Sequence, residues 1–178
     1  MNVSASTNVG KALGSAAGTG LVLTDHAMER DLRHHPFCRG MGDLHVATLT
    51  HCSHYWNLQA GEFLWRQGER ADTCFLVLAG RVSLELGVPN EGANRLEVLK
   101  GGDVLGWSWL LEDGRWHFDA RALTSVRGIA LDTAKMRALC AEDCEFGYAV
   151  LSRCTPLIAE RLERTGKLAL ELLRTAHT

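Results

Sequence analysis

Residues 61–87, GEFLWRQGERADTCFLVLAGRVSLELG, decide the fold class. Short runs of β-branched, aromatic and other apolar residues alternate here with glycines at positions 61, 68, 80 and 87. Each run is typical of a strand, and each glycine stands where one strand should turn into the next. This stretch therefore predicts antiparallel β-structure rather than helices.

Three runs further along the chain continue the pattern: residues 95–106, 117–123 and 126–132. With the first stretch they predict that the middle of the chain, from Tyr55 to Asp132, is an antiparallel roll or barrel. The expected fold class is mainly β with flanking helices, a jelly-roll β-roll followed by a C-terminal helix.

Helical patterns lie on both sides of the expected roll. Residues 25–41 and 42–56 are predicted to be short helices before it. After it, Asp132 can cap a helix over residues 133–140, because its carboxylate can accept hydrogen bonds from the free amides of the first turn. We predict three segments: a flexible tail at 1–24, the entry helices and roll at 25–140, and a helical segment at 141–178.

The last helix, from Glu142 onward, carries a seam of apolar and small residues spaced by three or four positions. Its members are Leu151, Cys154, Ile158, Leu162, Thr165, Ala169 and Leu172. Such a seam is typical of a helix that packs on another helix, and we expect a homodimer through it. The alternative is a helix that folds back on its own roll. Pro156 should kink this helix or divide it in two.

Composition and charge narrow the function. The chain has 178 residues, 46% hydrophobic and 22% charged, which is typical of one soluble globular domain. No apolar run approaches the ~18 residues of a membrane span, and the N-terminus is a poor signal peptide, so we predict a cytoplasmic protein. The balance of 19 basic and 21 acidic residues argues against a surface for nucleic acid or an anionic membrane.

Cysteines and histidines do not form a metal-binding pattern. The six cysteines contain no CxxC pair and are expected to be reduced, mostly buried thiols. Only Cys38 and Cys52 lie near the entry helix, too few for an iron–sulfur cluster. His51 and His54 would share one face of a predicted helix, yet a zinc site needs further ligands that the sequence does not identify. We expect no metal and no cofactor.

Enzymatic motifs are also missing from the sequence. A metal-dependent jelly-roll enzyme needs a His-x-His pair and a later histidine, but His117 is the only histidine between Gly61 and Asp132. The sequence has neither a Gly-x-Ser-x-Gly elbow nor a glycine-rich phosphate loop. We therefore predict a non-enzymatic protein.

The glycine pattern of the roll resembles the cyclic-nucleotide-binding domain family, as found in catabolite-activator-type bacterial regulators. The residues that carry the resemblance are Gly61, Glu62, Gly68, Glu69, Phe75, Gly80 and Val82. The resemblance covers residues 30 to about 175 and implies a β-roll with a C-terminal dimer helix. In the regulators a helix-turn-helix domain follows. Because this chain stops at Thr178, we expect a stand-alone domain with no DNA binding of its own.

Residues 101–110, GGDVLGWSWL, lie where this family has its phosphate-binding cassette. In nucleotide-binding members a glutamate of the cassette binds the ribose and a later arginine pairs with the cyclic phosphate. Here Trp107 stands at the place of the glutamate. Arg115 aligns with the phosphate arginine only if a gap is allowed, and otherwise Trp116 takes that place. Arg121 matches a second arginine of the family.

Trp107, Trp109 and Trp116 fall within ten residues, and two interpretations of them stay open. They close a former nucleotide pocket as core, or they form an aromatic wall for a small anionic ligand that meets Arg115. The candidate ligand residues are Gly106, Trp107, Ser108, Trp109, Arg115, Trp116, His117 and Arg121.

These observations lead to one expected function and one alternative. We expect a ligand-sensing or regulatory module whose remodelled, tryptophan-rich pocket binds cyclic AMP weakly or not at all. Its partner would be an unknown small anionic ligand or another protein. The alternative is a structural dimerisation module with a closed pocket.

Overall fold

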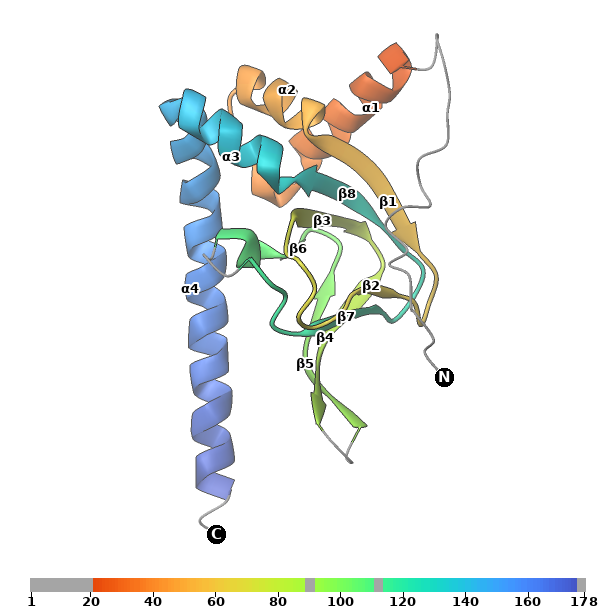
Figure 1. Ribbon diagram of the computed structural model, residues 1–178, viewed down its shortest axis with the longest axis vertical. Coiled ribbons are helices and arrows are strands. Elements are labelled where there is room, and N and C mark those ends of the chain that lie inside the picture. Colours follow the sequence, from red (N-terminus) through yellow and green to blue (C-terminus); the bar gives the residue numbers. More distant parts are fainter. Residues whose placement is uncertain (1–20, 89–91, 111–113, 176–178) are drawn as a thin grey trace. The chain divides into compact units, whose positions relative to one another are not determined.

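The computed structural model describes residues 21–88, 92–110 and 114–175. The chain divides into two compact units, Met1–Met136 and Arg137–Thr178. The first unit contains the β-roll and the entry helices, and the second contains most of the C-terminal helical segment (Figure 1).

The described part of the first unit contains two four-stranded sheets, with the orders β1-β8-β3-β6 and β2-β7-β4-β5, in which neighbouring strands are antiparallel. The strands are β1 (Ser53–Leu58), β2 (Phe63–Trp65), β3 (Thr73–Ala79), β4 (Arg81–Val88), β5 (Gly92–Lys100), β6 (Val104–Leu105), β7 (Asp119–Ala122) and β8 (Val126–Asp132). Strand order differs from chain order because the chain crosses between the sheets, as in a jelly roll. The predicted β-roll is confirmed.

Glycine makes one of these crossings possible. Gly80, between β3 and β4, has φ of 92°, and a Cβ there would lie 2.3 Å from the carbonyl oxygen of Ser125. No other residue could adopt this conformation without moving the neighbouring backbone.

The entry segment comprises α1 (Leu21–His34), the 3₁₀ turn η2 (Pro36–Cys38) and α2 (Asp43–His51). Most of the predicted tail, residues 1–20, lies outside the described residues, whereas α1 begins at Leu21.

The predicted helix over residues 42–56 is wrong in its last part. Residues 53–56 form the start of β1, because Tyr55 and Trp56 prefer an extended backbone when a partner strand is present. Here the partner is β8, against which Trp56 lies directly opposite Gly128.

The core of the roll lies between the two sheets. Its buried residues come from both: Trp56, Leu64, Trp65, Ala71, Phe75, Val77, Val82, Leu84, Leu99, Leu105, Trp116, Ala120, Ala122, Val126 and Ala130. Four of them are large aromatic residues, each at most 8% exposed. Aromatic side chains therefore fill much of the volume between the sheets.

The helices after the roll are α3 (Thr133–Glu142) and α4 (Cys144–Thr175). As predicted, Asp132 caps α3, since its Oδ1 accepts hydrogen bonds from the amides of Ala134 and Lys135 at 3.0 and 3.1 Å. The predicted division of the long helix at Pro156 is wrong, because α4 runs through it as one helix. A proline inside a helix removes a single backbone donor, which a helix of several turns can tolerate.

Candidate functional site

The cassette segment begins at β6 and continues through Gly106 into η3 (Trp107–Leu110), a 3₁₀ turn. Gly106 has φ of 85°, and a Cβ there would lie 2.7 Å from the ring of Trp116 and 2.9 Å from the carbonyl oxygen of Thr73. Only glycine allows the backbone to approach this ring so closely. Of the predicted ligand residues, the structure therefore brings Gly106 and Trp116 into contact.

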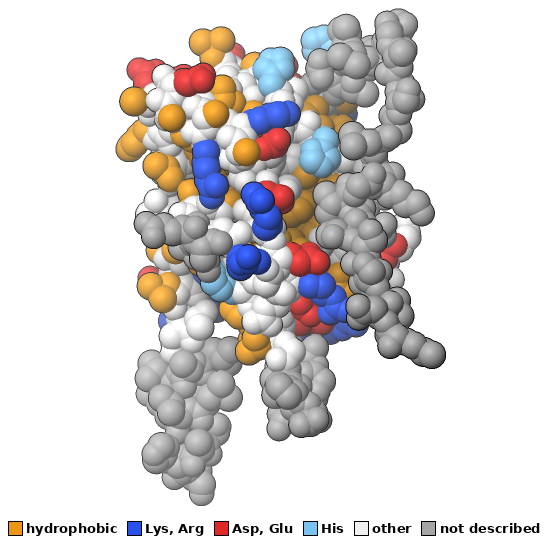
Figure 2. Space-filling view, in the orientation of Figure 1, with side chains coloured by type: hydrophobic (Ala, Val, Ile, Leu, Met, Phe, Trp, Pro, Cys, Tyr) orange, Lys and Arg blue, Asp and Glu red, His pale blue; other side chains and the backbone are white. Residues whose placement is uncertain are grey.

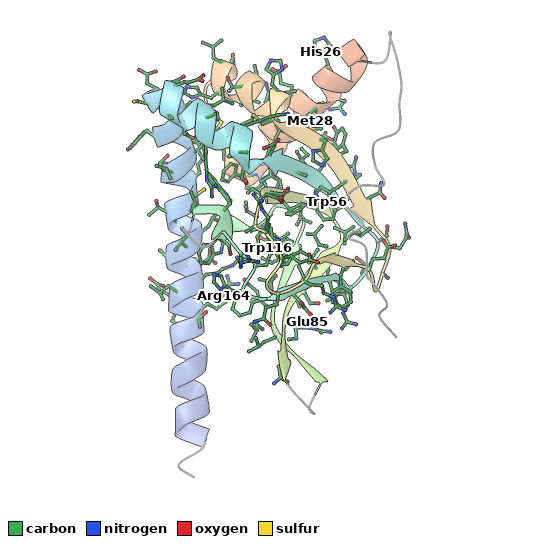
Figure 3. All side chains as sticks on the ribbon, in the orientation of Figure 1. His26, Met28, Trp56, Glu85, Trp116 and Arg164 are labelled. Carbon is green, nitrogen blue, oxygen red and sulfur yellow. The ribbon has the colours of Figure 1, made fainter. Side chains whose placement is uncertain are left out.

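The Trp116 ring lies in the interior of the roll, where Figure 3 also shows Trp56. It is 5% exposed and stacks on Trp65 with ring centroids 4.0 Å apart and an interplanar angle of 16°. Trp65 in turn stacks on Phe75 at 5.4 Å, and Phe75 meets the edge of Trp56 at 5.5 Å. We call these four rings, Trp116, Trp65, Phe75 and Trp56, the aromatic column.

The column ends at a second glycine. A Cβ on Gly128 would lie 2.7 Å from the Trp56 indole and 2.3 Å from the carbonyl oxygen of Leu76. The column thus runs from Gly106 in the cassette to Gly128 in β8, and both end rings lie against a backbone without a side chain.

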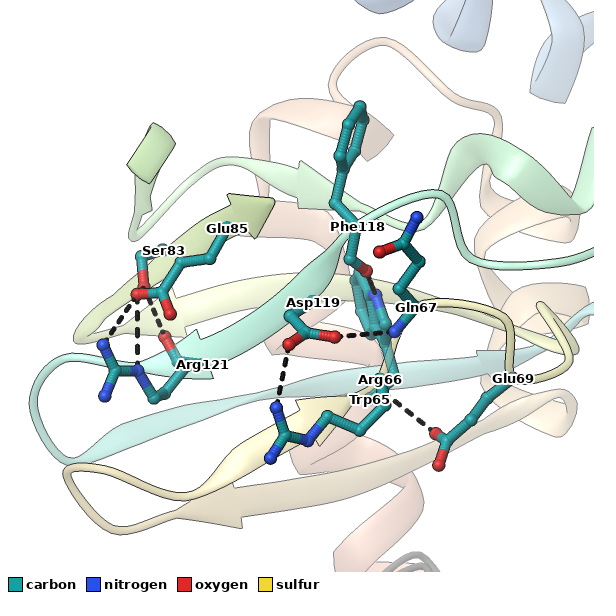
Figure 4. Close-up of polar contacts among 9 residues, drawn as sticks. All are labelled: Trp65, Arg66, Gln67, Glu69, Ser83, Glu85, Phe118, Asp119 and Arg121. Atoms are coloured by element: carbon teal, nitrogen blue, oxygen red, sulfur yellow. Dashed lines mark hydrogen bonds and ion pairs between the residues drawn. The ribbon is translucent and has the colours of Figure 1, made fainter. Parts of the chain in front are cut away.

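Trp56 and Trp65 are the site residues that sequence reasoning missed. Each of these tryptophans lies in a short run of residues that the structure shows to be a strand, which is the signal that could have identified it. Neither run is near the cassette in the sequence. A hydrogen bond from Trp65 Nε1 to the carbonyl oxygen of Phe118, 2.8 Å long, holds Trp65 against the segment that carries Trp116 (Figure 4).

The other cassette side chains differ in exposure. Trp109 is buried, at 3% exposed, whereas Trp107 and Ser108 are half-buried. Leu110 is also half-buried. The cassette therefore turns one tryptophan fully into the protein and leaves the other partly open to solvent.

Arg115 and His117, which flank Trp116, are exposed. Arg115 Nη1 donates a hydrogen bond to the carbonyl oxygen of Gly68 at 2.7 Å. The guanidinium is thus held at the turn after β2, while the neighbouring indole occupies the interior. Arg115 and Trp116, the two residues that align with the family's phosphate-binding arginine with and without a gap, therefore have opposite orientations.

Arg121 lies on β7 between the core residues Ala120 and Ala122, so its side chain is on the opposite face of the sheet. There its Nη2 and Nε contact Glu85 Oε1 at 2.9 and 3.3 Å, and Ser83 Oγ donates to the same oxygen at 2.6 Å (Figure 4). Glu85 is only 3% exposed. Burial alone would raise the pKa of Glu85, but the hydrogen bonds from Ser83 and Arg121 hold it below its ordinary value.

A second group of polar contacts joins the turn after β2 to β7. Asp119 accepts hydrogen bonds from the amide of Gln67 at 2.7 Å and from Arg66 Nη1 at 2.8 Å (Figure 4). The guanidinium of Arg66 also lies 3.4 Å from the centroid of the Phe63 ring. Arg66 and Arg121 are thus both paired with carboxylates, and neither points into the interior of the roll.

The histidine pair considered above does not share a helix face. His51 is the last residue of α2, whereas His54 lies in β1, so the predicted helical spacing is wrong. Within the described residues, no three His, Cys, Asp or Glu side chains form a group that could hold a metal ion. None of the six cysteines, all of which lie in the described part of the chain, forms a disulfide.

The predicted seam on α4 is unevenly exposed. Leu151 is 50% and Leu162 73% exposed, Ile158 is half-buried, and Thr165 is exposed. Cys154 is 3% exposed, and burial raises the pKa of its thiol to about 11. The side chains of Ala169 and Leu172 lie outside the described residues.

One exposed aromatic residue was not included in that seam. Tyr148, one turn before Leu151, is 77% exposed. It lies within the same face of α4 as Leu151 and Leu162, because residues three, four or seven apart share a helix face.

On the face shown in Figure 2, Lys and Arg side chains are interspersed with Asp and Glu side chains. No helix among residues 21–175 that the structure describes is both long and apolar enough to cross a membrane.

Comparison with known proteins agrees with this fold. The profile of the cyclic nucleotide-binding domain family matches residues 55–143. The CRP-like cAMP-activated global transcriptional regulator of Mycobacterium tuberculosis is 24% identical over 130 residues, which are 73% of this chain and 56% of that protein. The chain therefore spans little more than half the length of this curated relative.

Solved structures show the same architecture. A putative cyclic nucleotide-binding protein from Geobacter metallireducens has a TM-score of 0.68 and 21% identity, covering 76% of this chain and 98% of that one. The catabolite activator protein of Thermus thermophilus has a TM-score of 0.63 and 25% identity, covering 78% and 62%. The family profile, which spans half of the sequence, and the matching β-roll together show that this chain belongs to the cyclic nucleotide-binding domain family.

Proposed function

We propose that this chain is a non-enzymatic regulatory module whose roll is closed by its own aromatic side chains. It takes up no cyclic nucleotide between its sheets and acts by pairing with a second copy through α4. The matched relatives, a transcriptional regulator and nucleotide-binding proteins, support a regulatory role.

The observation that carries the proposal is the position of the Trp116 ring. It lies on the cassette glycine and stacks on Trp65, so the space next to the cassette backbone is filled. Of the two interpretations of the tryptophans, the burial of Trp109 and Trp116 favours core over a ligand-lining wall.

Charge placement supports the same proposal. A cyclic phosphate buried in the roll would need a guanidinium or a comparable donor beside it. Arg115 instead contacts the carbonyl oxygen of Gly68, and Arg121 pairs with Glu85 on the opposite face of its sheet. Neither arginine is placed to offset the cost of burying a phosphate in the interior.

Titration calorimetry with cyclic AMP and cyclic GMP tests the closed roll. We expect no saturable binding up to millimolar nucleotide. Loss of one charged hydrogen-bond partner alone costs about 1.5–3 kcal/mol, and here the ring would also have to leave. Submicromolar affinity for either nucleotide would show that the roll opens and that the proposal is wrong.

The pairing surface is the exposed apolar face of α4, formed by Tyr148, Leu151, Ile158 and Leu162. Three of these side chains are at least half exposed although they are large and apolar. Their spacing of three, seven and four residues places them along one stripe of the helix. A second copy of α4 offers the same stripe, and a two-fold axis would bring like residues together.

Leu162→Glu tests the pairing, because it places a charge within the stripe, at its C-terminal member. We expect the wild type to sediment as a dimer at micromolar concentration and this variant as a folded monomer. Lys167→Glu is the matched control: it introduces the same residue at an exposed position away from the stripe and should remain dimeric. A monomeric wild type, or equal behaviour of the two variants, would exclude the stripe as the interface.

A further inference from the structure

Trp116 is fixed in the roll by its backbone as well as by its ring. Its amide donates a hydrogen bond to the carbonyl oxygen of Glu69 at 2.9 Å, and its carbonyl oxygen accepts one from the amide of Gly68 at 2.8 Å. Next to it, the amide of Ala71 donates to the carbonyl oxygen of Gly114 at 2.6 Å. The segment that carries the indole is therefore clamped to the turn after β2 on both sides of Trp116.

The Trp116 ring is surrounded by the protein in the way that a bound planar ligand would be. One neighbour is the parallel face of Trp65, and another is the backbone at Gly106, whose missing side chain leaves room for the ring edge. The ring lies near the aromatic rings of Trp65 and Phe75 and the backbone of Gly106, and the nearest arginine in sequence, Arg115, is turned away to Gly68. Such a place suits an uncharged bicyclic aromatic ring.

We propose that Trp116 is an internal ligand of the roll, and that its indole holds the cassette in one conformation without any small molecule. The inference rests on the proposed function, because a roll that is closed needs something to keep its cassette ordered. A tethered ring loses no translational freedom when it docks, so a free ligand of similar size cannot compete with it effectively. The module would then be constitutively in one state, and removing the indole would make it dependent on an added aromatic ligand.

The experiment is Trp116→Gly with indole added as the probe. Hydrogen exchange of the backbone amides of residues 104–110 reports on the order of the cassette, and the urea midpoint reports on overall stability. We expect exchange in the cassette to accelerate roughly tenfold or more in Trp116→Gly, and added indole to return it toward the wild-type rate.

Trp56→Gly is the matched control at the other end of the aromatic column. Trp56 is as deeply buried, at 8% against 5% exposed, but it lies on Gly128 rather than on the cassette. Its loss should lower the urea midpoint without a selective acceleration at 104–110. Should Trp116→Gly prove too unstable to purify, Trp116→Ala gives the same comparison, because it also removes the whole indole.

The inference fails if indole does not slow cassette exchange in the Trp116 variants, or if Trp56→Gly frees the cassette to the same extent. Either outcome would make Trp116 an ordinary core residue and leave the closed roll intact. Binding of cyclic AMP by the wild type would instead overturn the proposed function itself, so the two failures are distinguishable.

Discussion

The pair Glu85–Arg121 gives the sharpest energetic prediction. Arg121→Met keeps most of the length of the side chain but removes both donors to a carboxylate that is 3% exposed. Breaking a fully buried pair costs about 3–5 kcal/mol because a charge is left uncompensated. The Arg121 side chain is 38% exposed, so water can replace part of what is lost, and we expect a smaller cost of about 2–3 kcal/mol at pH 7.

The pH dependence separates this effect from a loss of packing. In the wild type the pKa of Glu85 lies below its ordinary value, so its contribution to stability is present above the unfolded-state pKa and is lost as the pH falls through the folded-state pKa. Without Arg121, only the hydrogen bond from Ser83 and the charge of Arg95 still oppose the effect of burial, and we expect the pKa of Glu85 to rise above the unfolded-state value. The deficit of Arg121→Met should therefore shrink between pH 7 and pH 5, as Glu85 takes up a proton.

Urea unfolding followed by tryptophan fluorescence at pH 7 and pH 5, at one protein concentration, measures both quantities. The double variant Glu85→Gln/Arg121→Met removes the charge and should recover much of the loss, with no relief at low pH. A cost below about 0.5 kcal/mol that is the same at both pH values would mean that the pair behaves as an exposed ion pair, and would refute the reasoning.

Two further predictions concern the cassette glycine and a buried histidine. Gly106→Ala should lower the free energy of unfolding more than Gly68→Ala does, by about 2 kcal/mol. Both glycines have φ near +85°, but only at Gly106 does the Trp116 ring occupy the space that the added methyl group needs. Equal urea midpoints of the two variants would contradict this prediction. His35 is buried, and its Nδ1 accepts a hydrogen bond from the amide of Phe37. Burial lowers the pKa of His35, although the carbonyl oxygens of Val77 and Asp103 and the charge of Asp103 act in the opposite direction. Since the unfolded chain then binds the proton more readily, wild-type stability should fall as the pH drops below about 6.5. In His35→Asn, which keeps a side-chain acceptor for the amide of Phe37, the free energy of unfolding should fall less steeply. A slope between pH 7.5 and 5.5 equal to that of the wild type would contradict this prediction.

Local sequence signals predicted the fold well where they are strong. Glycines at positive φ fall at the turns after β1, β2 and β3, at Gly61, Gly68 and Gly80, as the pattern of alternating strands and glycines predicted. The predicted turn at Gly87 is wrong, because Gly87 lies inside β4 and pairs with Ala93 of β5. Asp132 marks the start of α3 for the physical reason that predicted it. Residues 53–56 were mispredicted because a strand with few apolar residues is stabilised by its neighbour, and the pairing of β1 with β8 joins segments far apart in sequence.

The candidate site was harder to predict, because it depends on which side of a strand each residue faces. Counting back in twos from Ala122 and Ala120 assigns both Phe118 and Trp116 to the interior. The chain bends at residues 117–118, however, so Phe118 is 37% exposed while Trp116 remains buried. A bend of this kind leaves no clear mark in the sequence, and without it the orientations of Arg115 and Trp116 could not be assigned.

The stacking of Trp65 on Trp116 depends on the meeting of two segments that lie far apart in the sequence. Trp65 lies in β2, and Trp116 precedes β7, and these strands pair with an irregular register between Phe63 and Trp65. Beside that irregularity, the hydrogen bond from Trp65 Nε1 to the carbonyl oxygen of Phe118 holds the two segments together. Such an irregularity changes which residues of a strand face the interior, since each single step of register reverses the direction of a side chain. The position of Trp65 against Trp116, on which the proposed closed roll rests, thus involves a register irregularity that the identity of the cassette residues does not reveal.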